Sequence, residues 1–173
     1  ISHGIALTSG TTGAFVEDNE VHRNAKMTGT GTAGIQVSGS SSNVFLRNRF
    51  HHNQDSGVVI TAVSNNNRFV QNLSWSNAVR GFEHIASTGT LHIGDVAWGN
   101  GEDGFSMTET ATGTRIHDSI AVDNGTATGN YNLYVDSGSV TGFAGDYNLY
   151  WNSTCQQPVR FGSIQYDTVS AYS

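Results

Sequence analysis

The chain has 173 residues, of which 36% are hydrophobic and 13% are charged, and its formal net charge is −6. This composition is typical of one folded domain and excludes a disordered chain. The excess of 14 Asp and Glu over 8 Lys and Arg argues against nucleic-acid binding, which needs a basic surface. No apolar run approaches the ~20 residues of a membrane-spanning helix, so we expect no membrane insertion.

A repeat runs through the chain from its first residues. Each copy opens with Gly and a short apolar strand, passes through a polar turn to a second strand, and closes with a third strand before Asn. The opening position is occupied, in chain order, by Gly4, Gly34, Gly57, Gly81, Gly104 and Asn132. The end of the second strand is marked by Asn19, Asn48, Asn72, Asp95, Asp118 and Asp146. Both series lengthen at the same copies, which indicates a true period of roughly two dozen residues.

Each copy is predicted to hold three short strands separated by turns of Gly, Ser, Thr and Asn. A single copy cannot bury its apolar face, whereas stacked copies bury a continuous core. The inward positions of the first strand are predicted to be Ile5/Leu7, Ile35/Val37, Val58/Ile60, Phe82/His84, Phe105/Met107 and Leu133/Val135. The sequence therefore predicts an all-β fold, a right-handed parallel β-helix (solenoid) of about six coils with three short strands per coil.

Polar residues at the corners are expected to stack from coil to coil. One predicted ladder consists of Asn19, Asn48, Asn72, Asp95 and Asp118, and another consists of Asn24, Asn53, Asn77, Asn100 and Asn124. Stacked amides hydrogen-bond to one another, and Asn tolerates the left-handed backbone of tight corners. These properties predict a structural role for both ladders in preference to metal ligation.

The repeat divides the chain into two regions. Residues 1–152 carry the β-helix repeats, and residues 153–173 are expected to form a C-terminal excursion or cap that packs on the last coil. Asp167 is expected to cap a short helix there. An open coil end exposes apolar core and unpaired strand edges. We therefore expect either flanking coils of a longer chain or end-to-end self-association.

This pattern resembles the pectate-lyase-like superfamily of right-handed β-helix proteins over nearly the whole chain, from Gly4 to about Asn152. The segments VAWGNGEDGF (residues 96–105) and IAVDNG (residues 120–125) are particularly similar to coils of secreted bacterial pectate lyases. The resemblance implies a secreted, bacterial-type protein that acts on or binds acidic polysaccharide, with β-elimination as the expected reaction. It also implies that calcium is the cofactor if the protein uses one.

Two departures from the family pattern leave the enzyme class open. Where calcium-dependent members carry Asp-Asp-Gly-Phe-Asp, this chain has EDGFS at residues 102–106, so Ser106 replaces the last ligand. The Lys that usually abstracts the proton is not found: the matching positions hold Glu83 and Ser106, and the single Lys of the chain is Lys26 in the first coil. The alternatives are a polysaccharide lyase and a non-catalytic adhesive, carbohydrate-binding or structural β-solenoid module.

Adjacent coils are expected to bring charged residues together on one face. The position before the opening Gly holds Arg80 and Asp103, and the position two residues after it holds Glu83. We therefore predict Arg80, Glu83 and Asp103 as catalytic residues. In elimination, Arg80 is the candidate that neutralises the uronate carboxylate. Alternatively, Glu83 and Asp103 act as general acid and base in the hydrolysis of a glycosidic bond. Glu102 and Asp103 are the candidate metal ligands, and a surface ion pair is the alternative interpretation.

Further residues of the same columns are candidates for contact with sugar. The position two residues after the opening Gly holds Gln36, Ser106 and Tyr134 in other coils. Hydroxyl, amide and phenol groups supply the hydrogen bonds that orient a polar ligand on a protein surface. We predict that these three residues bind substrate.

One position of the third strand is aromatic in most coils. It holds His22, His51, Trp75 and Trp98, with Tyr150 and Trp151 close to the same position later in the chain. An exposed column of this kind stacks on sugar rings, which makes Trp75 and Trp98 substrate-binding candidates. A buried column is a core ladder, and the small neighbours Ser74 and Ala97 favour that interpretation.

Overall fold

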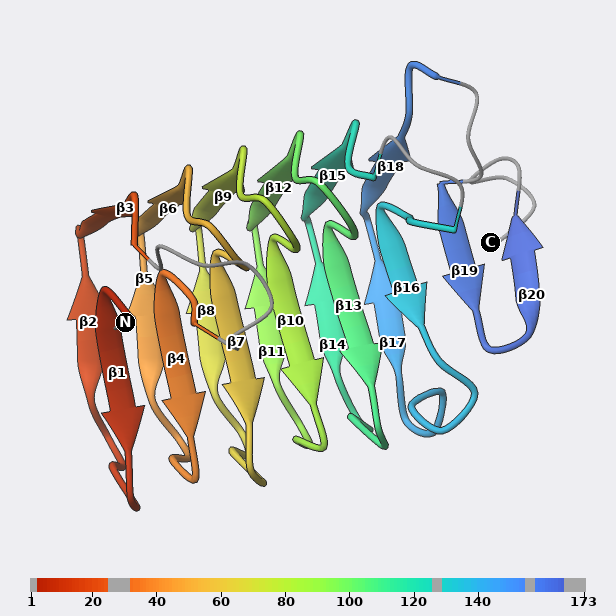
Figure 1. Cartoon of the computed structure of the whole chain (residues 1–173). Helices are drawn as coiled ribbons and strands as arrows, with labels where there is room; N and C mark the ends of the chain where they lie inside the picture. Colours follow the sequence, from red (N-terminus) through yellow and green to blue (C-terminus); the bar gives the residue numbers. More distant parts are fainter. Residues whose placement is uncertain (1–2, 25–31, 126–128, 155–157, 167–173) are drawn as a thin grey trace.

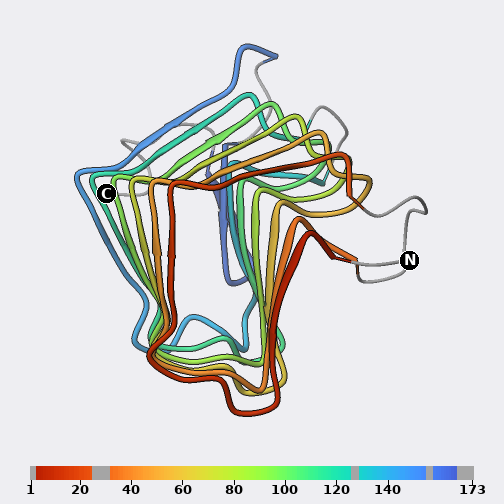
Figure 2. The same cartoon turned by 90° about the vertical axis from the view of Figure 1, so that its left-hand side faces the viewer.

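The computed structural model describes residues 3–24, 32–125, 129–154 and 158–166 of the chain. This part of the chain contains twenty strands and no helix, and the strands wind into a rod of stacked coils (Figure 1). Each of six coils gives one strand to each of three sheets, which enclose the core when the rod is viewed along its axis (Figure 2). The predicted parallel β-helix is confirmed. Among the described residues, no helix is long and apolar enough to cross a membrane.

The sheets are named first, second and third in the order in which each coil visits them. The first sheet consists of β1 (Ile5–Thr8), β4 (Ile35–Ser38), β7 (Val58–Thr61), β10 (Phe82–Ile85), β13 (Phe105–Thr108), β16 (Leu133–Val135), β19 (Val159–Phe161) and β20 (Ile164–Tyr166). The second consists of β2 (Phe15–Glu17), β5 (Val44–Leu46), β8 (Arg68–Val70), β11 (Leu91–Ile93), β14 (Arg115–His117) and β17 (Ala144–Asp146). The third consists of β3 (Glu20–His22), β6 (Arg49–His51), β9 (Leu73–Trp75), β12 (Val96–Trp98), β15 (Ile120–Val122) and β18 (Leu149–Trp151).

The core is built from columns of inward side chains that the strand register aligns. In the first sheet the predicted inward residues pair in register from coil to coil, and they are buried except for the partly exposed Ile5. Phe45 and Phe69 of the second sheet stack with their ring centroids 4.4 Å apart. Burying a side chain of this size stabilises the fold by about 1.5–3 kcal/mol. The predicted core of the first sheet is thus confirmed.

The opening Gly of each coil is required by a close approach between neighbouring coils. A Cβ atom on Gly81 would lie 2.6 Å from the carbonyl oxygen of Gly104 and 2.9 Å from Nδ2 of Asn100. A Cβ atom on Gly57 would lie 2.9 Å from the carbonyl oxygen of Gly81 in the next coil, and 2.2 Å from Oγ of Ser74 in its own coil. A side chain at either position would push adjacent coils apart, which explains why Gly marks the repeat.

The ladder predicted at the end of the third strand is confirmed. Nδ2 of Asn77 donates to Oδ1 of Asn100 at 2.9 Å, and Oδ1 of Asn77 accepts from Nδ2 of Asn53 at 2.9 Å. The same contact joins Asn124 to Asn132 at 2.9 Å. The ladder therefore runs one rung further than predicted, into the residue that replaces the opening Gly of the last coil.

The other predicted ladder is correct as far as Asp95 and wrong beyond it. The amide N–H of Asp95 donates to Oγ of Ser119 at 3.2 Å, and the amide N–H of Ser119 donates to Oδ1 of Asn148 at 2.9 Å. The expected residue Asp118 lies one position earlier, at a corner with a φ of 52°. Ser119 therefore takes the rung that the spacing of the repeat gave to Asp118.

Beyond residue 152 the chain returns to the first sheet. β19 pairs in parallel with β16, which places Arg160 opposite Tyr134. β20 then pairs antiparallel with β19 at the edge of the sheet. The described residues 158–166 thus pack on the last coil, whereas the predicted helix cap at Asp167 lies outside the described residues.

Candidate functional site

Arg80 lies in the turn before β10, where it contacts carboxylates of its own coil and of the next. Its Nη1 atom is 2.5 Å from Oε1 of Glu83, its Nη2 atom is 2.9 Å from Oε2 of Glu102, and its Nε atom is 3.2 Å from Oδ2 of Asp103. Arg80 and Glu83 flank the opening Gly of one coil. Glu102 and Asp103 precede the opening Gly of the next coil, so the stacking of the coils brings all four residues together.

Solvent reaches the four side chains to different extents. The side chains of Asp103 and Glu83 are 6% and 11% exposed, whereas those of Arg80 and Glu102 are 27% and 39% exposed. Burial raises the pKa of Asp103, although the amide of Tyr131 and the charge of Arg80 act in the opposite direction. Burial acts to lower the pKa of Arg80, but the three neighbouring carboxylates raise it above its ordinary value. The site therefore keeps a charged guanidinium beside a carboxyl that holds its proton more readily than an exposed Asp.

Two contacts of the site were not predicted from the sequence. The hydroxyl of Ser56 donates to Oε2 of Glu83 at 2.9 Å, and the amide N–H of Tyr131 donates to Oδ1 of Asp103 at 2.8 Å. Both oxygens of each buried carboxylate are therefore engaged. Ser56 and Tyr131 precede the opening residue of their coils, as Arg80 does, so the register of the repeat was the signal that would have found them.

The predicted substrate-binding residues of the first sheet lie in one outward column. Gln36, Ser106 and Tyr134 belong to β4, β13 and β16, and Glu83 lies in the same column. Ser106 is the direct neighbour of both Glu83 and Tyr134, whereas Gln36 is two coils away from Glu83. Gln36 and Tyr134 are partly exposed, and Ser106 is buried. Val59 lies between Gln36 and Glu83, so the polar and aromatic part of the column runs from Glu83 to Tyr134. It begins at the group formed by Arg80, Glu83, Glu102 and Asp103, which we call the Arg80 cluster.

A second cation, Arg160, lies further along the same face, opposite Tyr134 in the register of the first sheet. The rings of Tyr131 and Tyr134 stack with centroids 5.8 Å apart, and the guanidinium of Arg160 lies 5.3 Å from the centroid of the Tyr134 ring. The phenol oxygen of Tyr131 accepts from Nε2 of Gln165 at 2.5 Å. Arg160 and Gln165 were not predicted from the sequence, because the repeat pattern is lost after residue 152. The alternation of apolar and polar residues in VRF, at residues 159–161, is the signal that indicates a strand there.

Trp75 and Trp98 lie on a different face of the rod, the outer side of the third sheet. In β9 and β12 the buried residue is the middle one, Ser74 or Ala97, whereas Trp98 is 53% exposed. The buried aromatic ladder favoured from the sequence is therefore wrong. Ser74 and Ala97 are small because the opening Gly packs against them: a Cβ atom on Gly81 would lie 3.1 Å from Cβ of Ala97.

The predicted metal ligands Glu102 and Asp103 both contact Arg80, whose guanidinium lies between their carboxylates. Within the described residues, no group of three or more His, Cys, Asp or Glu side chains is placed to hold a metal ion. A calcium site needs about six to eight oxygen ligands. The residues at this position therefore do not fit a calcium site. The use of calcium stays a prediction, which an activity assay with and without the ion tests.

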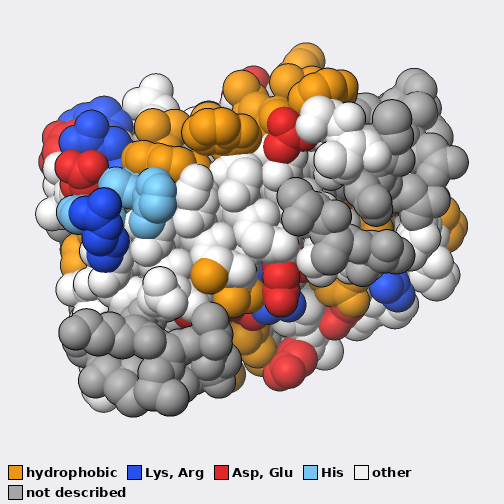
Figure 3. Space-filling view, turned by 45° about the horizontal axis from the view of Figure 1, so that its top comes forward, with side chains coloured by type: hydrophobic (Ala, Val, Ile, Leu, Met, Phe, Trp, Pro, Cys, Tyr) orange, Lys and Arg blue, Asp and Glu red, His pale blue; other side chains and the backbone are white. Residues whose placement is uncertain are grey.

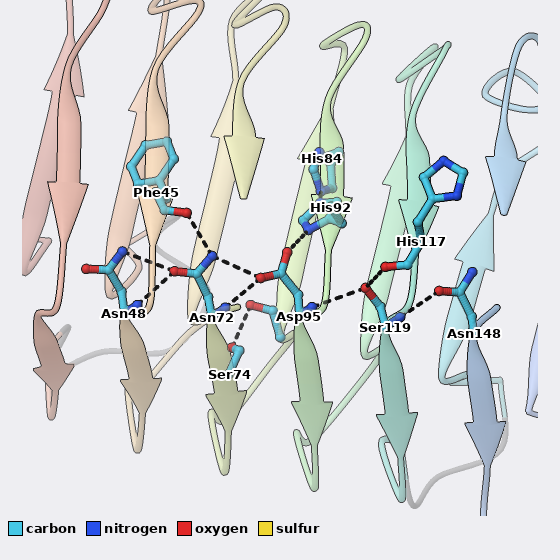
Figure 4. A network of polar contacts seen from close by, with 11 residues as sticks. Phe45, Asn48, Asn72, Ser74, His84, His92, Asp95, His117, Ser119 and Asn148 are labelled. Atoms are coloured by element: carbon cyan, nitrogen blue, oxygen red, sulfur yellow. Dashed lines mark hydrogen bonds and ion pairs between the residues drawn. The ribbon is translucent and has the colours of Figure 1, made fainter. Parts of the chain in front are cut away.

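A second cluster of titratable groups lies inside the rod (Figure 4). Nδ1 of His92 is 2.8 Å from Oδ2 of Asp95, and Nε2 of His92 is 3.0 Å from Nε2 of His84. Oδ1 of Asp95 also accepts from Nδ2 of Asn72 at 2.9 Å. Burial, together with the neighbouring His92, lowers the pKa of His84 well below its ordinary value. All of these side chains are fully buried, so the network belongs to the core and is not a substrate site.

Solved structures of polysaccharide enzymes are similar to this chain in fold. A double mutant of the periplasmic alginate epimerase AlgG superposes with a TM-score of 0.72 at 18% identity, over 87% of this chain and 36% of that chain. A single mutant of the same epimerase gives a TM-score of 0.70 at 19% identity, over 87% and 42%. The pectate lyase Pel9A gives a TM-score of 0.53 at 24% identity, over 70% and 33%. The chain thus spans less than half of each of these proteins.

Sequence comparison identifies a family. None of the curated proteins matches the chain in sequence. The family described as "Right handed beta helix region" matches residues 2–97, which is more than half of the chain. The matched residues cover the first three coils and most of the fourth, including the opening Gly of each of these coils. The chain belongs to the family of right-handed β-helix proteins.

Proposed function

We propose that this chain is part of an extracytoplasmic protein that acts on acidic polysaccharide along the outer face of the first sheet. The observation that carries the proposal is the setting of Arg80, which two buried carboxylates hold in place while its third partner, Glu102, is only partly buried. Alginate and pectate are both polyuronates, so the structural neighbours named after them support this substrate class. The periplasmic location in the name of the epimerase supports an extracytoplasmic site of action.

The proposed binding mode replaces one ion pair by another. In the free protein Oε2 of Glu102 lies 2.9 Å from Nη2 of Arg80. A uronate carboxylate has the same charge and geometry, and it takes the place of Glu102 when Glu102 swings into solvent. Arg160, three strands further in the first sheet, lies about 14 Å along the rod and meets a second carboxylate of the same polymer. The partly exposed Tyr134 lies between these two cations along the rod, where its phenol hydroxyl offers a hydrogen-bonding group to the polymer.

The proposed reaction is β-elimination at the uronate held by Arg80. A base removes the proton on C5, the C4=C5 double bond forms, the bond from C4 to the glycosidic oxygen breaks, and that oxygen takes up a proton. Arg80 stabilises the charge that develops on the carboxylate. We assign the role of base to Glu83. We assign the role of acid to Asp103, because the raised pKa of Asp103 favours its protonated form, which can donate a proton to the glycosidic oxygen.

A non-catalytic polysaccharide-binding module is the second candidate. It is favoured by one observation: Arg80, Ser56 and the amide of Tyr131 already occupy both oxygens of Glu83 and of Asp103. A base and an acid must release these partners before they transfer protons. The two candidates share the binding site and differ in whether a bond is broken.

The test is the ultraviolet absorbance of the unsaturated uronate that elimination creates. Wild-type protein is incubated at high concentration with polygalacturonate, alginate and glycosaminoglycans, with and without calcium. We expect absorbance to rise with one of these polymers, and to rise at least about tenfold more slowly in the Asp103→Asn variant, which cannot donate the same proton.

Matched variants separate the site from general effects on the fold. Arg80→Lys keeps the positive charge beside the buried carboxylates but loses the forked geometry, so it is expected to fold and to lose activity. Arg115→Lys makes the same change at an exposed position of the second sheet and is expected to retain activity. If no polymer gives absorbance under any condition, the elimination step is wrong and the binding module becomes the leading proposal.

A further inference from the structure

From the third coil onward, both outward positions of the third sheet are apolar. We call these residues the apolar strip: Leu73, Trp75, Val96, Trp98, Ile120, Val122, Leu149 and Trp151. Figure 3 shows hydrophobic side chains gathered along this face, with His and charged side chains at its end over the first coils. In those first two coils the same positions hold Glu20, His22, Arg49 and His51. The strip is therefore confined to four of the six coils.

The apolar strip is large for a surface exposed to water. Its most exposed members are Leu73 at 39%, Trp98 at 53%, Ile120 at 39%, Leu149 at 50% and Trp151 at 52%. If a large side chain presents about 150–250 Å² in full, these five together expose roughly 500 Å² of apolar surface. The largest apolar patch of a typical monomer is about 300–600 Å² and often marks an interaction site.

We propose that the apolar strip is the interface of a symmetric dimer of this chain. Two strips placed face to face bury roughly 1,000 Å², and polar side chains at the rim add to this area. Specific interfaces begin at about 1,000 Å² of total buried surface, so the strip is large enough to hold a second copy. A flat sheet face also matches a copy of itself, because a two-fold axis brings the same surface from both partners.

The distribution of charge selects the orientation of the two rods. In an antiparallel pair, the third to sixth coils of one copy cover the sixth to third coils of the other. The first two coils, with Glu20 and Arg49, then project beyond the partner and stay hydrated. Charged residues are depleted from the centre of interfaces because their desolvation is costly. The antiparallel pair meets this condition.

The chemistry of the apolar strip is poorly suited to sugar. The ring of Trp75 stacks on that of His51 with centroids 4.2 Å apart and an angle of 16° between planes, so one ring face is covered. The indole N–H is the one side-chain hydrogen-bonding group that the strip offers. Sugar sites combine open ring faces with several convergent polar groups. The strip resembles a protein interior, which is what the opposing face of a second copy supplies.

The chain offers a direct spectroscopic test, because its three Trp residues, Trp75, Trp98 and Trp151, all belong to the apolar strip. We expect sedimentation velocity to show a dimer whose fraction rises with protein concentration. The Trp emission maximum is expected to shift to shorter wavelength over the same range, because association removes the indoles from water. Trp98→Lys is expected to raise the dimer dissociation constant at least about tenfold. Phe15→Lys, at a 59% exposed apolar residue of the second sheet, is expected to leave it unchanged.

Three results would overturn the proposal. The first is a protein that stays monomeric at the highest concentration reached, with no shift in Trp emission. The second is a dimer that Trp98→Lys leaves intact, because its interface then lies elsewhere. The third is a monomer whose Trp emission responds to polygalacturonate or alginate, which would assign the strip to sugar. The measurements of dimer formation do not depend on the proposed polysaccharide site, which lies on the first sheet.

Discussion

Acidification below about pH 6.5 is expected to lower the free energy of unfolding, by up to about 1.4 kcal/mol per pH unit from His84 alone. The pKa of His84 is lowered in the folded protein, chiefly by burial and further by its electrostatic interaction with the neighbouring His92. Above the unfolded pKa both states are neutral at this residue, and the contribution to stability is complete. As the pH falls towards the folded pKa, the unfolded chain binds a proton that the folded chain does not, so stability is lost.

The hydrogen bonds of the network give the physical reason. With Nδ1 of His92 donating to Oδ2 of Asp95, Nε2 of His92 accepts from Nε2 of His84. Nδ1 of His84 is then the ring atom without a proton, and it is buried with no hydrogen-bond partner. Protonation of His84 would place a charged N–H group in the core with no acceptor, which costs several kcal/mol in a low-dielectric interior.

The preceding coil shows how to remove the effect. In the register of the sheets, His84 lies opposite Ile60, and His92 lies opposite Phe69. The triple variant His84→Ile, His92→Phe, Asp95→Asn copies the pattern of that coil, including an amide in the ladder. Urea unfolding at a series of pH values is expected to show a loss of stability below about pH 6.5 in the wild type and a smaller loss in the triple variant, because the partly buried His3 also has a lowered pKa in the folded protein.

A matched control is His22→Gln, which removes an exposed His of the first coil and is expected to keep the wild-type pH dependence. For each protein, the quantity compared is the difference between its free energy of unfolding at neutral pH and at acidic pH. A variant that is less stable at neutral pH can therefore still be compared with the wild type. Equal stability of the wild type across this range would contradict the assignment. A triple variant that loses as much stability as the wild type would place the titrating group elsewhere.

Asn77→Ala is expected to lower the free energy of unfolding by about 3 kcal/mol, because it interrupts a buried ladder at its centre. Oδ1 of Asn77 accepts from the amide N–H and from Nδ2 of Asn53, and both donors lose this partner. Its Nδ2 donates to the carbonyl of Phe50 at 3.1 Å, which is left without this donor. A buried polar group without a partner costs about 1–3 kcal/mol. The loss is measured as the shift in urea midpoint at constant slope.

The control for this prediction is the same change at the first rung of the same ladder. Asn24 is partly exposed, and its Nδ2 donates to Oδ1 of Asn53 at 3.1 Å. Water replaces part of what Asn24→Ala removes, so we expect a loss of about 1 kcal/mol or less. Equal losses in the two variants would show that the ladder is not what stabilises the corner.

The repeat made the fold predictable because its markers have direct physical roles. The opening Gly is fixed by the approach of neighbouring coils, as at Gly81, and the corner Asn is fixed by hydrogen bonds that only an amide completes, as at Asn77. The rung after Asp95 could not be placed in the same way. Asp118 and Ser119 are adjacent and both polar, and only the pairing of β11 with β14 decides between them.

The candidate site was predictable to the extent that it lies in repeat columns. Arg80 and Asp103 hold the same position in adjacent coils, so stacking alone places them together. Arg160 lies in a strand that follows the last regular coil, where no period remains to align it. Ser74 and Trp75 are adjacent in one strand, so the sequence shows that they face opposite sides of the sheet but not which of them faces inward. The opening Gly packs closely against the inward residue, which must therefore be small, and this contact is seen only in the structure.

Arg80 is proposed to bind a uronate carboxylate in the place that Glu102 now holds. This role is tested most directly by titration calorimetry with oligogalacturonate and oligomannuronate, on the wild type and on Glu102→Gln and Arg80→Lys. Glu102→Gln removes a competitor for the guanidinium. An exposed ion pair is worth about 0–1 kcal/mol, so affinity is expected to rise by up to about fivefold. Arg80→Lys is expected to weaken binding by about tenfold.

Arg115→Lys and Arg68→Lys are the controls, at exposed positions of the second sheet, and are expected to bind as the wild type does. If Arg80 binds the carboxylate, Glu102→Gln and Arg80→Lys change the affinity for the same oligosaccharide in opposite directions. Binding that is unchanged in both variants, or weakened equally by both, would contradict this role and leave the Arg80 cluster as an ion-pair network that joins two coils.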